Sequence, residues 1–353
     1  MTNLPEWARA YGAIAGSGKI RTTPEDFHVE EILGFAADGA GEHRLLRVEK
    51  RGANTIWVAR ELARYAGIPA RDVSYAGIKD RHAVAVQHFS LWLGKQPEPD
   101  WSALANPEFR VLAVARHSRK LRRGALKGNR FRLVLRELSV PAAELQPRLE
   151  IIREQGVPNY FGPQRFGRNG DNIERAEKFF DDPRSIRDRK LRGLLLSSAR
   201  SLIFNAVLSR RVTNRTWNRI LPGDVCMLDG SHSVFLADSV DDSLLSRAAA
   251  GDVHPSGPLW GRGQSRVSGE VAALETSVTQ EHASFVRGLE EAGLEQARRA
   301  LRLPARDLIW RADYAHTLIL EFCLPAGAYA TAVLRELIDT DTAHTGDSDA
   351  DEN

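Results

Sequence analysis

The stretch VSYAGIKDRHA, residues 73–83, joins two predicted strands and carries the densest chemical signal in the chain. An apolar run comes first, Gly77 then lets the backbone turn closely, and Asp80 follows between Lys79 and Arg81. Neighbouring positive charges favour an ionised carboxylate, which is the form that a nucleophile requires. A solvated surface turn with clustered charges would show the same pattern. The stretch therefore makes Asp80 a candidate catalytic residue, and a surface turn is the alternative interpretation.

The residues on both sides of this stretch predict a sheet with few helices. Strand-like runs occupy residues 27–32, 43–48, 73–78, 84–93, 109–115 and 131–138. Asn54 and Gly67 suit the two ends of a helix between them. Because the order lacks a strict strand–helix–strand rhythm, we expect an α+β fold with a mixed, largely antiparallel sheet.

The second half of the chain has a different texture. We expect helices over residues 173–180, 194–212 and 328–338, and a loop rich in glycine and proline over residues 255–266. This change predicts a catalytic domain of residues 1–156 and 304–340, interrupted by an inserted α/β domain of residues 157–303. We expect residues 341–353 to be a disordered acidic tail.

Two segments have the composition of an RNA-contacting surface. Eight of the 17 residues from 116 to 132 are lysine or arginine, with no acid among them, and Phe131 lies beside them. Such a segment suits phosphates and a stacked base, although it also fits a solvated loop whose Phe131 enters the core. Residues 159–172 interleave Tyr160, Phe161 and Phe166 with arginine and asparagine, which suits unstacked bases or the contact between two domains.

Composition narrows the protein class. The chain has 353 residues, of which 42% are hydrophobic and 27% charged, as in an ordinary globular protein of two domains. The net charge is +3, and it rises to +9 without the six acids that follow residue 338, so a polyanionic partner suits the body of the chain. The two cysteines, Cys226 and Cys323, predict a reduced, cytoplasmic protein without a disulfide framework.

Several other classes are not expected. No run of apolar residues approaches the roughly 18 that a membrane-spanning helix needs, and residues 1–20 lack the pattern of a secretory signal. Neither nucleotide-binding glycine motif nor a zinc-binding H-E-x-x-H occurs. The acidic pairs Glu25-Asp26 and Glu30-Glu31 fit a metal nuclease poorly, because adjacent side chains on a strand point to opposite faces.

Three segments resemble the TruD family of tRNA pseudouridine synthases: AGIKDRHA at residues 76–83, LKGNRF at 126–131 and PNYFGPQRFG at 158–167. Weaker similarity at residues 24–27 and 324–331 extends the resemblance over almost the whole chain. The resemblance implies a pseudouridine synthase catalytic domain with the family's own inserted domain. It also implies isomerisation of uridine 13 in tRNA, without a metal or an organic cofactor.

The resemblance also implies roles for individual residues. Asp80 matches the catalytic aspartate, and Phe131 matches the aromatic residue that packs against the target base. Asn129 lies in the same segment, and Phe27 matches a further active-site aromatic. Tyr329 stands where the family usually has phenylalanine, so its hydroxyl group needs a partner if it is buried.

The sequence leaves some questions open. The family places a basic residue near Arg21, which makes Arg21 and Lys79 rival partners for the carboxylate of Asp80. A non-catalytic protein that binds structured RNA and a metal-dependent nuclease remain the two alternatives. A monomer is the default expectation.

Overall fold

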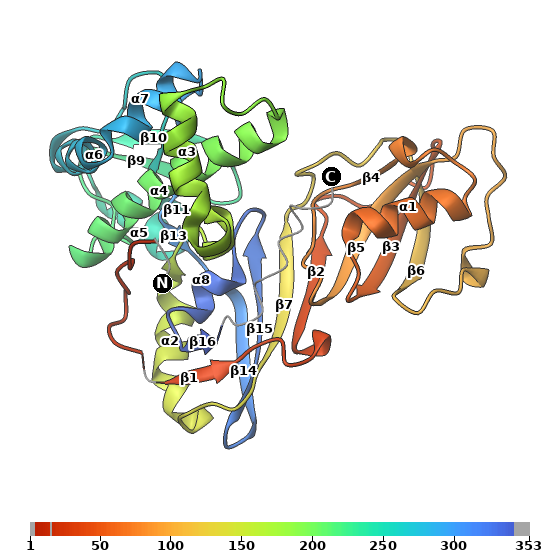
Figure 1. Ribbon diagram of the computed structural model, residues 1–353. Helices are drawn as coiled ribbons and strands as arrows, with labels where there is room; N and C mark the ends of the chain where they lie inside the picture. The colour runs from red at the N-terminus through yellow and green to blue at the C-terminus, as the bar shows by residue number, and fades with distance from the viewer. Residues whose placement is uncertain (1–3, 15, 342–353) are drawn as a thin grey trace.

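The protein is described by a computed structural model over residues 4–14 and 16–341. Its main sheet has eight strands, seven of them in the order β14-β15-β7-β2-β5-β3-β6, and β4 pairs with β5 (Figure 1). Only β2 and β5 run parallel, so the expected α+β fold with a mixed, largely antiparallel sheet is confirmed. The strands are β2 (Phe27–Ile32), β3 (His43–Arg51), β4 (Val73–Tyr75), β5 (Val84–Trp92), β6 (Phe109–His117), β7 (Gly128–Leu135), β14 (Arg306–Tyr314) and β15 (Thr317–Pro325).

The two halves of this sheet have separate hydrophobic cores. Helix α1 (Thr55–Tyr65) buries Val58 and Leu62 against β3 and β5, and its N-cap Asn54 accepts a hydrogen bond from the Ile56 amide. At the other end, α2 (Gln146–Gln155) and α8 (Ala330–Leu334) pack with β7, β14 and β15. The halves meet where β2 lies between β7 and β5. Phe27 of β2 packs in the core that is formed with α2, α8, β7, β14 and β15.

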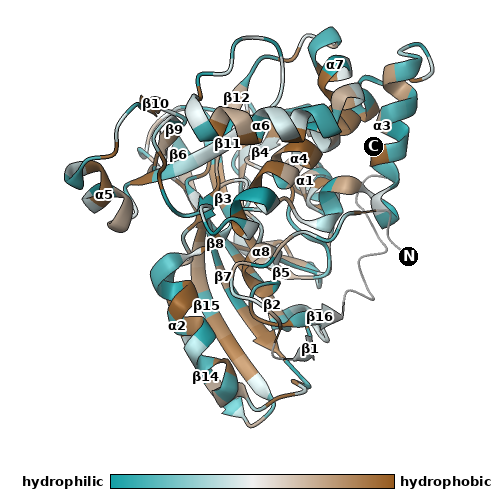
Figure 2. Ribbon diagram, turned by 90° about the vertical axis from the view of Figure 1, so that its left-hand side faces the viewer, coloured by the Kyte–Doolittle hydropathy of each residue, from teal (hydrophilic) through white to brown (hydrophobic). Residues whose placement is uncertain are grey.

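The predicted insert, residues 157–303, has a helical layer on a small antiparallel sheet. Strands β9 (Asp224–Leu228), β10 (Val234–Ala237), β11 (Val253–Leu259) and β12 (Ala297–Ala300) form this sheet. The helices are α3 (Asp171–Asp181), α4 (Arg189–Thr213), α5 (Asp242–Ala249), α6 (Gly269–Glu281) and α7 (Ala283–Glu291). Figure 2 shows β15 of the main sheet largely hydrophobic and α3 of the insert largely hydrophilic.

Helix α4 is the centre of the insert. It buries Leu202, Ile203 and Phe204 in a core that also contains Phe161, Phe179 and Phe285. Among the described helices, α4 alone is long and apolar enough to cross a membrane by length and composition, but 56% of its most apolar window is buried. Its hydrophobicity is therefore accounted for by the core that it forms.

The connection between the insert and the rest of the chain is built from paired strands. Strand β8 (Val157–Pro158) pairs with β13 (Arg302–Leu303), so the chain leaves and re-enters the main body at one place. The segment near the N-terminus also contacts the insert, since Leu4 and Trp7 pack against its core. The division into domains at residues 157 and 303 remains a prediction.

Two expected elements differ in the structure. The predicted loop over residues 255–266 begins as strand β11, because β11 pairs with β9 up to Pro255 and with β12 from Ser256 onward. Each of its prolines thus has a paired strand on one side only, where a missing N–H group is tolerated. The predicted helix over residues 328–338 is regular only as α8.

The acidic end of the chain begins inside the fold. Strand β16 (Asp339–Asp341) pairs in parallel with β1 (Ser17–Lys19), so residue 341 belongs to a strand and not to the predicted tail. Residues 342–353 of that tail lie outside the described residues.

Candidate active site

The loop of residues 76–83 crosses a gap in the main sheet. Strand β5 pairs with β2 over Val84–Val86 and with β4 over Phe89–Leu91 on the same edge. The backbone amide of His88 lies between these two pairings and donates instead to the Glu31 carboxylate at 2.8 Å. A side chain therefore completes the ladder where the two strands separate, and the loop that carries Asp80 passes beside it.

Lys79 is bound within this gap. Its Nζ donates to Glu31 Oε1 at 2.7 Å, and both side chains are buried. Burial raises the pKa of Glu31, but the hydrogen bond from His88 and the charge of Lys79 outweigh it, so the pKa of Glu31 lies below its usual value. Lys79 is thus the partner of Glu31 and fixes the position of the loop.

Two further residues hold the loop backbone. Lys50 is fully buried, and its Nζ donates to the carbonyl oxygens of Ala53 at 2.7 Å and of Asp80 at 2.8 Å. Thr55 Oγ1 accepts a hydrogen bond from the Lys79 amide at 3.1 Å. Lys50 was not among the residues predicted from the sequence, although a lysine two residues after the buried Val48 of a strand is a detectable anomaly.

Arg21 is the partner of Asp80. Its Nη2 lies 2.5 Å from Asp80 Oδ2, while Asp80 Oδ1 accepts a hydrogen bond from the His82 amide at 3.0 Å. Arg21 has a φ of +58°, an uncommon conformation for a residue other than glycine, which structures tend to retain at functional sites. The Asp80 side chain is 34% exposed, so it remains open to a ligand. The geometry resolves the choice between Arg21 and Lys79.

Aromatic rings line the sheet beside this ion pair. The guanidinium of Arg21 lies 4.2 Å from the ring centre of Phe27, and Phe27 meets Phe131 edge-on at 6.1 Å. Phe131 in turn stacks on Phe322 at 5.5 Å. Arg21, Phe27 and Phe131 thus form one continuous contact from the carboxylate of Asp80. No sequence pattern identifies Phe322, which faces Phe131 only because β15 pairs with β7 in this register.

Asn129 lies on the same strand as Phe131 and two residues before it. It is directly opposite Glu31 on β2 and Leu324 on β15, so the alternation of side chains places Asn129 on the face of Phe131. Its Oδ1 is buried without a hydrogen-bond partner within the described residues. An unsatisfied amide oxygen on the face that carries the ring of Phe131 is suited to accept a hydrogen bond from a bound base.

Tyr329 belongs to a different cluster. It packs against the core of the insert, and its hydroxyl oxygen accepts a hydrogen bond from Arg165 Nη2 at 2.7 Å. Its ring meets Phe161 at 6.2 Å. The hydroxyl that distinguishes this residue from the family's usual phenylalanine therefore has a partner. Among the hydrogen bonds and ring contacts of the described residues, none joins Tyr329 to Asp80, Arg21 or Phe131.

The basic segment of residues 116–132 runs next to the loop that carries Asp80. The Gly124 amide donates to the carbonyl oxygen of Ala76 at 2.7 Å, and the guanidinium of Arg123 lies 5.4 Å from the ring centre of Tyr75. Leu121 is buried against Ala76. The arginine side chains between β6 and β7 remain exposed, so a row of positive charge borders the loop that holds Asp80.

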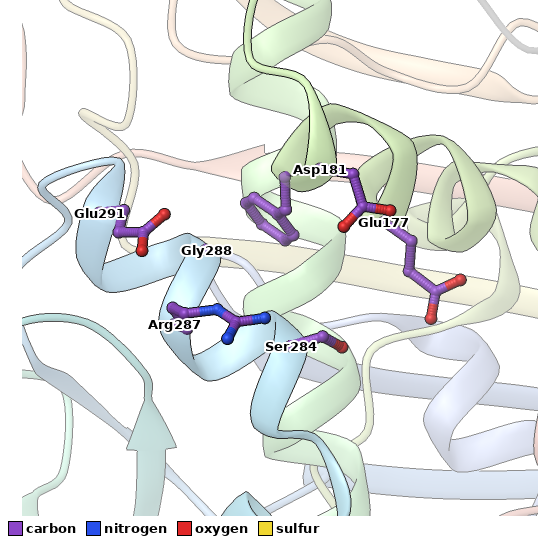
Figure 3. A pocket seen from close by; sticks show the side chains of 7 residues that line it. Glu177, Asp181, Ser284, Arg287, Gly288 and Glu291 are labelled. Carbon is purple, nitrogen blue, oxygen red and sulfur yellow. The ribbon is translucent and has the colours of Figure 1, made fainter.

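The acidic pairs form ion pairs with separate basic side chains. Glu30 pairs with Arg47 and Glu31 with Lys79, while the two other acids, Glu25 and Asp26, pair with Arg51 and Arg136. Within residues 4–14 and 16–341, no group of three or more acidic, histidine or cysteine side chains has the arrangement of a metal site. A hollow between α3 and α7, lined by Glu177 and Arg287 among others, contains none of the predicted site residues (Figure 3).

Comparison with known proteins agrees with this geometry. Residues 11–176 and 182–337 match the profile of the family described as tRNA pseudouridine synthase D (TruD). The chain belongs to the TruD family. The match contains the loop of Asp80, the strand of Phe131 and the segment around Phe161, so the resemblance seen in the short motifs is confirmed.

Close relatives cover nearly the full length of the chain. A tRNA pseudouridine synthase D of Methylococcus capsulatus is 50% identical over 333 residues, which are 94% of each chain. The protein of the same name from Nitrosococcus oceani is 51% identical over 326 residues, 92% of this chain and 91% of that one. The fold is similar to that of a crystal structure described as TruD from Methanosarcina mazei, with a TM-score of 0.72 at 22% identity over 94% of this chain and 95% of that one.

Proposed function

We propose that this chain is a tRNA pseudouridine synthase that isomerises uridine 13, with Asp80 as the nucleophile. Its relatives at about half identity carry the name tRNA pseudouridine synthase D, which disfavours a non-catalytic RNA-binding protein. The observation that carries the proposal is the ion pair of Arg21 with Asp80, in which the Arg21 guanidinium lies over the ring of Phe27 and Phe27 contacts Phe131 edge-on. A partly exposed carboxylate beside an aromatic floor has the parts required to act on a planar base.

The reaction moves one bond within the nucleotide. The target uridine leaves its stack, because the glycosidic bond is not accessible inside a folded RNA. Asp80 attacks the sugar C1′ or the uracil C6, the bond from C1′ to N1 breaks, and the uracil turns within the pocket. A bond from C1′ to C5 then forms, the bond to the Asp80 carboxylate breaks, C5 releases its proton, and N1 gains one. No electrons are exchanged with a second reactant.

Each neighbouring side chain has a proposed task in these steps. Arg21 balances the charge of the Asp80 carboxylate, which is nucleophilic in its ionised form. Phe27 and Phe131 confine the detached uracil, and Asn129 accepts a hydrogen bond from it through the unpartnered Oδ1. Lys79 positions the loop through Glu31 and does not contact the substrate.

The basic segment beside the loop is proposed to hold the RNA. Its exposed arginines neutralise phosphates near the target nucleotide, and recognition rests on the shape of the folded tRNA more than on its sequence. We further propose a monomer in the cytoplasm that works without a metal or an organic cofactor. Free thiols at Cys226 and Cys323 are compatible with a reducing compartment.

The test is tritium release from a tRNA transcribed with 5-tritiated uridine, since C5 loses its hydrogen only if the base is re-attached there. The wild type should release tritium equal to one uridine per tRNA, and a transcript with cytidine at position 13 should release none. A chelator should change neither result, and the RNA should stay intact. Release from the cytidine-13 transcript would contradict the position, and chain cleavage that a chelator stops would favour the nuclease.

A further inference from the structure

A cluster of hydrogen-bond donors lies at the junction of the main body and the insert. We call Arg165, Arg299, Tyr329 and Thr331 the junction cluster. Both arginines lie near the ring of Phe161, with Arg299 at 4.2 Å and Arg165 at 5.5 Å from its centre. All four residues are half-buried, and two of their polar atoms, Arg165 Nε and Thr331 Oγ1, are fully buried.

The positive charges of this cluster have no negative partner. No carboxylate within residues 4–14 and 16–341 forms an ion pair with Arg165 or Arg299, in contrast to the paired arginines elsewhere. Arg299 donates instead to Asn159 Oδ1 at 2.6 Å and to the carbonyl oxygen of Gly327 at 3.2 Å. Burial lowers the pKa of Arg299 to about 10, and the charge of Arg165 acts in the same direction. A cluster of this kind lacks an anion.

Several polar groups of the cluster also have unused hydrogen-bonding capacity. Arg165 Nε and Thr331 Oγ1 are buried and form no hydrogen bond within the described chain. Tyr329 accepts from Arg165 through its oxygen, which leaves its own proton free to be donated. Unused donors around unpaired guanidinium groups match the acceptor oxygens of a phosphate group.

The same surroundings disfavour a nucleobase as the ligand. Phe161 is the ring at the centre of the cluster, but it is buried and already contacts Phe204 and Tyr329 as well as Arg299. Its ring is thus held by protein contacts, whereas no carboxylate within the described residues matches the charge of the two guanidinium groups. The donors point to a charged group on the RNA backbone.

Strand β15 links the junction cluster to Phe131 and Asn129 of the proposed active site. That strand places Phe322 on Phe131 and Leu324 opposite Asn129, and the chain then continues through Gly327 to Tyr329 and Thr331. The Ala326 amide donates to the carbonyl oxygen of Lys127, which ties this connection to the basic segment. A phosphate at the junction cluster would therefore belong to the same RNA whose base lies over Phe131.

We propose that the junction cluster binds one backbone phosphate of the substrate RNA. The inference rests on the proposed function, because it names a contact made by the same substrate. Arg165 and Arg299 supply the charge, and the hydroxyl groups of Tyr329 and Thr331 complete the hydrogen bonds. Bound RNA thus supplies the anion that the protein lacks at the contact between its two parts.

The test combines variants with neutral linkages in the RNA. The dissociation constant of tRNA is measured against salt for the wild type, Arg165→Gln, Tyr329→Phe and the control Arg64→Gln. Arg64 is an exposed arginine on α1 that pairs with Glu61, so its variant loses the same charge away from the cluster. We expect about tenfold weaker binding and a salt slope smaller by about 1 for Arg165→Gln. Tyr329→Phe should weaken binding about threefold, and the control should bind almost as the wild type.

Methylphosphonate linkages, which carry no charge, then locate the phosphate. Ligated tRNAs with one neutral linkage each are bound to the wild type and to Arg165→Gln. One linkage should weaken the wild type about tenfold and weaken Arg165→Gln by a smaller factor, because Arg299 still contacts that phosphate in the variant. Tritium release by the wild type is measured on the same tRNA, so failure of the enzyme assignment is seen separately.

Two results would overturn the proposal while the wild type remains active. One is Arg165→Gln and Tyr329→Phe binding tRNA with the affinity and salt slope of the wild type. The other is that each neutral linkage weakens Arg165→Gln by the same factor as it weakens the wild type. If Arg165→Gln does not fold, Tyr329→Phe decides alone, because it retains the ring and all the packing of Tyr329.

Discussion

The site around Asp80 and the junction cluster differ in how their charges are balanced. At the site, Asp80 pairs with Arg21 and Glu31 with Lys79, so the charges are matched before any ligand binds. In the junction cluster, Arg165 and Arg299 have no carboxylate partner within the described residues. We infer that the site around Asp80 is pre-organised for the proposed chemical step, whereas the cluster is complete only with an anion. Substitutions in the two places should therefore change different kinetic constants.

Among the residues that surround Asp80, the largest effect is expected for Arg21→Gln. The carboxylate of Asp80 would lose its matching charge, and kcat should fall about 100-fold or more, as when an enzyme loses an electrostatic contact to its reacting group. The dissociation constant of tRNA should stay within about twofold. Arg21→Lys, which retains the charge, should recover much of the rate. A normal kcat for Arg21→Gln would remove Arg21 from the chemical step.

The second prediction concerns the buried pair that anchors the loop. Glu31→Gln leaves Lys79 without its charged partner, and breaking a buried pair in this way costs about 3–5 kcal/mol. Denaturation in urea should show a lower midpoint than in the wild type. An unchanged midpoint would mean that the pair does not hold the loop.

The pH dependence of stability gives the same pair a separate test. The pKa of Glu31 lies below its usual value of 4.5 in the folded protein. The stabilisation is therefore present above that value and is lost as the pH falls through the folded pKa. The midpoint of Glu31→Gln should vary less with pH below 4.5 than that of the wild type. Parallel curves would contradict the assignment.

Arg165→Gln should show the reverse of Arg21→Gln. Its KM for tRNA should rise about tenfold while kcat at saturating tRNA stays within about twofold, because the lost contact is made equally before and during reaction. Steady-state tritium release over a range of tRNA concentrations measures both constants. A lower kcat with normal KM would place Arg165 in the chemical step instead.

The smallest effect is expected at a surface ion pair on the other face of the sheet. Arg47 pairs with Glu30 at 2.5 Å, but both side chains are partly exposed, and such pairs contribute less than about 1 kcal/mol. Arg47→Ala should change neither kcat nor the urea midpoint measurably. A loss as large as that of Glu31→Gln would show that exposure is a poor guide to the importance of these pairs.

Local patterns in the sequence were sufficient for much of the fold. The alternation over residues 27–32 predicted β2, and Asn54 marked the start of α1. Strand β11 was missed because its prolines resemble a loop, and only the change of partner strand at Pro255 explains how they fit. Such pairing depends on residues far apart in the chain, which local patterns do not report.

The candidate site was predictable in its parts but not in its pairings. Asp80 was identified from its segment, yet the choice of Arg21 over Lys79 required the buried Glu31 that binds Lys79. Phe322 lies beside Phe131 because of the register of β15 with β7. Arg165 lies beside Tyr329 because the insert contacts the main body there. These relations arise only when distant segments fold together.

The most direct measurement is the single-turnover rate of pseudouridine formation by Asp80→Asn at saturating tRNA. We expect a rate at least about 1000-fold below that of the wild type, because an amide cannot act as the nucleophile. The dissociation constant of tRNA, measured on the same samples, should stay within about twofold of the wild type. A rate within tenfold of the wild type would place the nucleophile elsewhere and contradict the role given to the pair of Arg21 and Asp80.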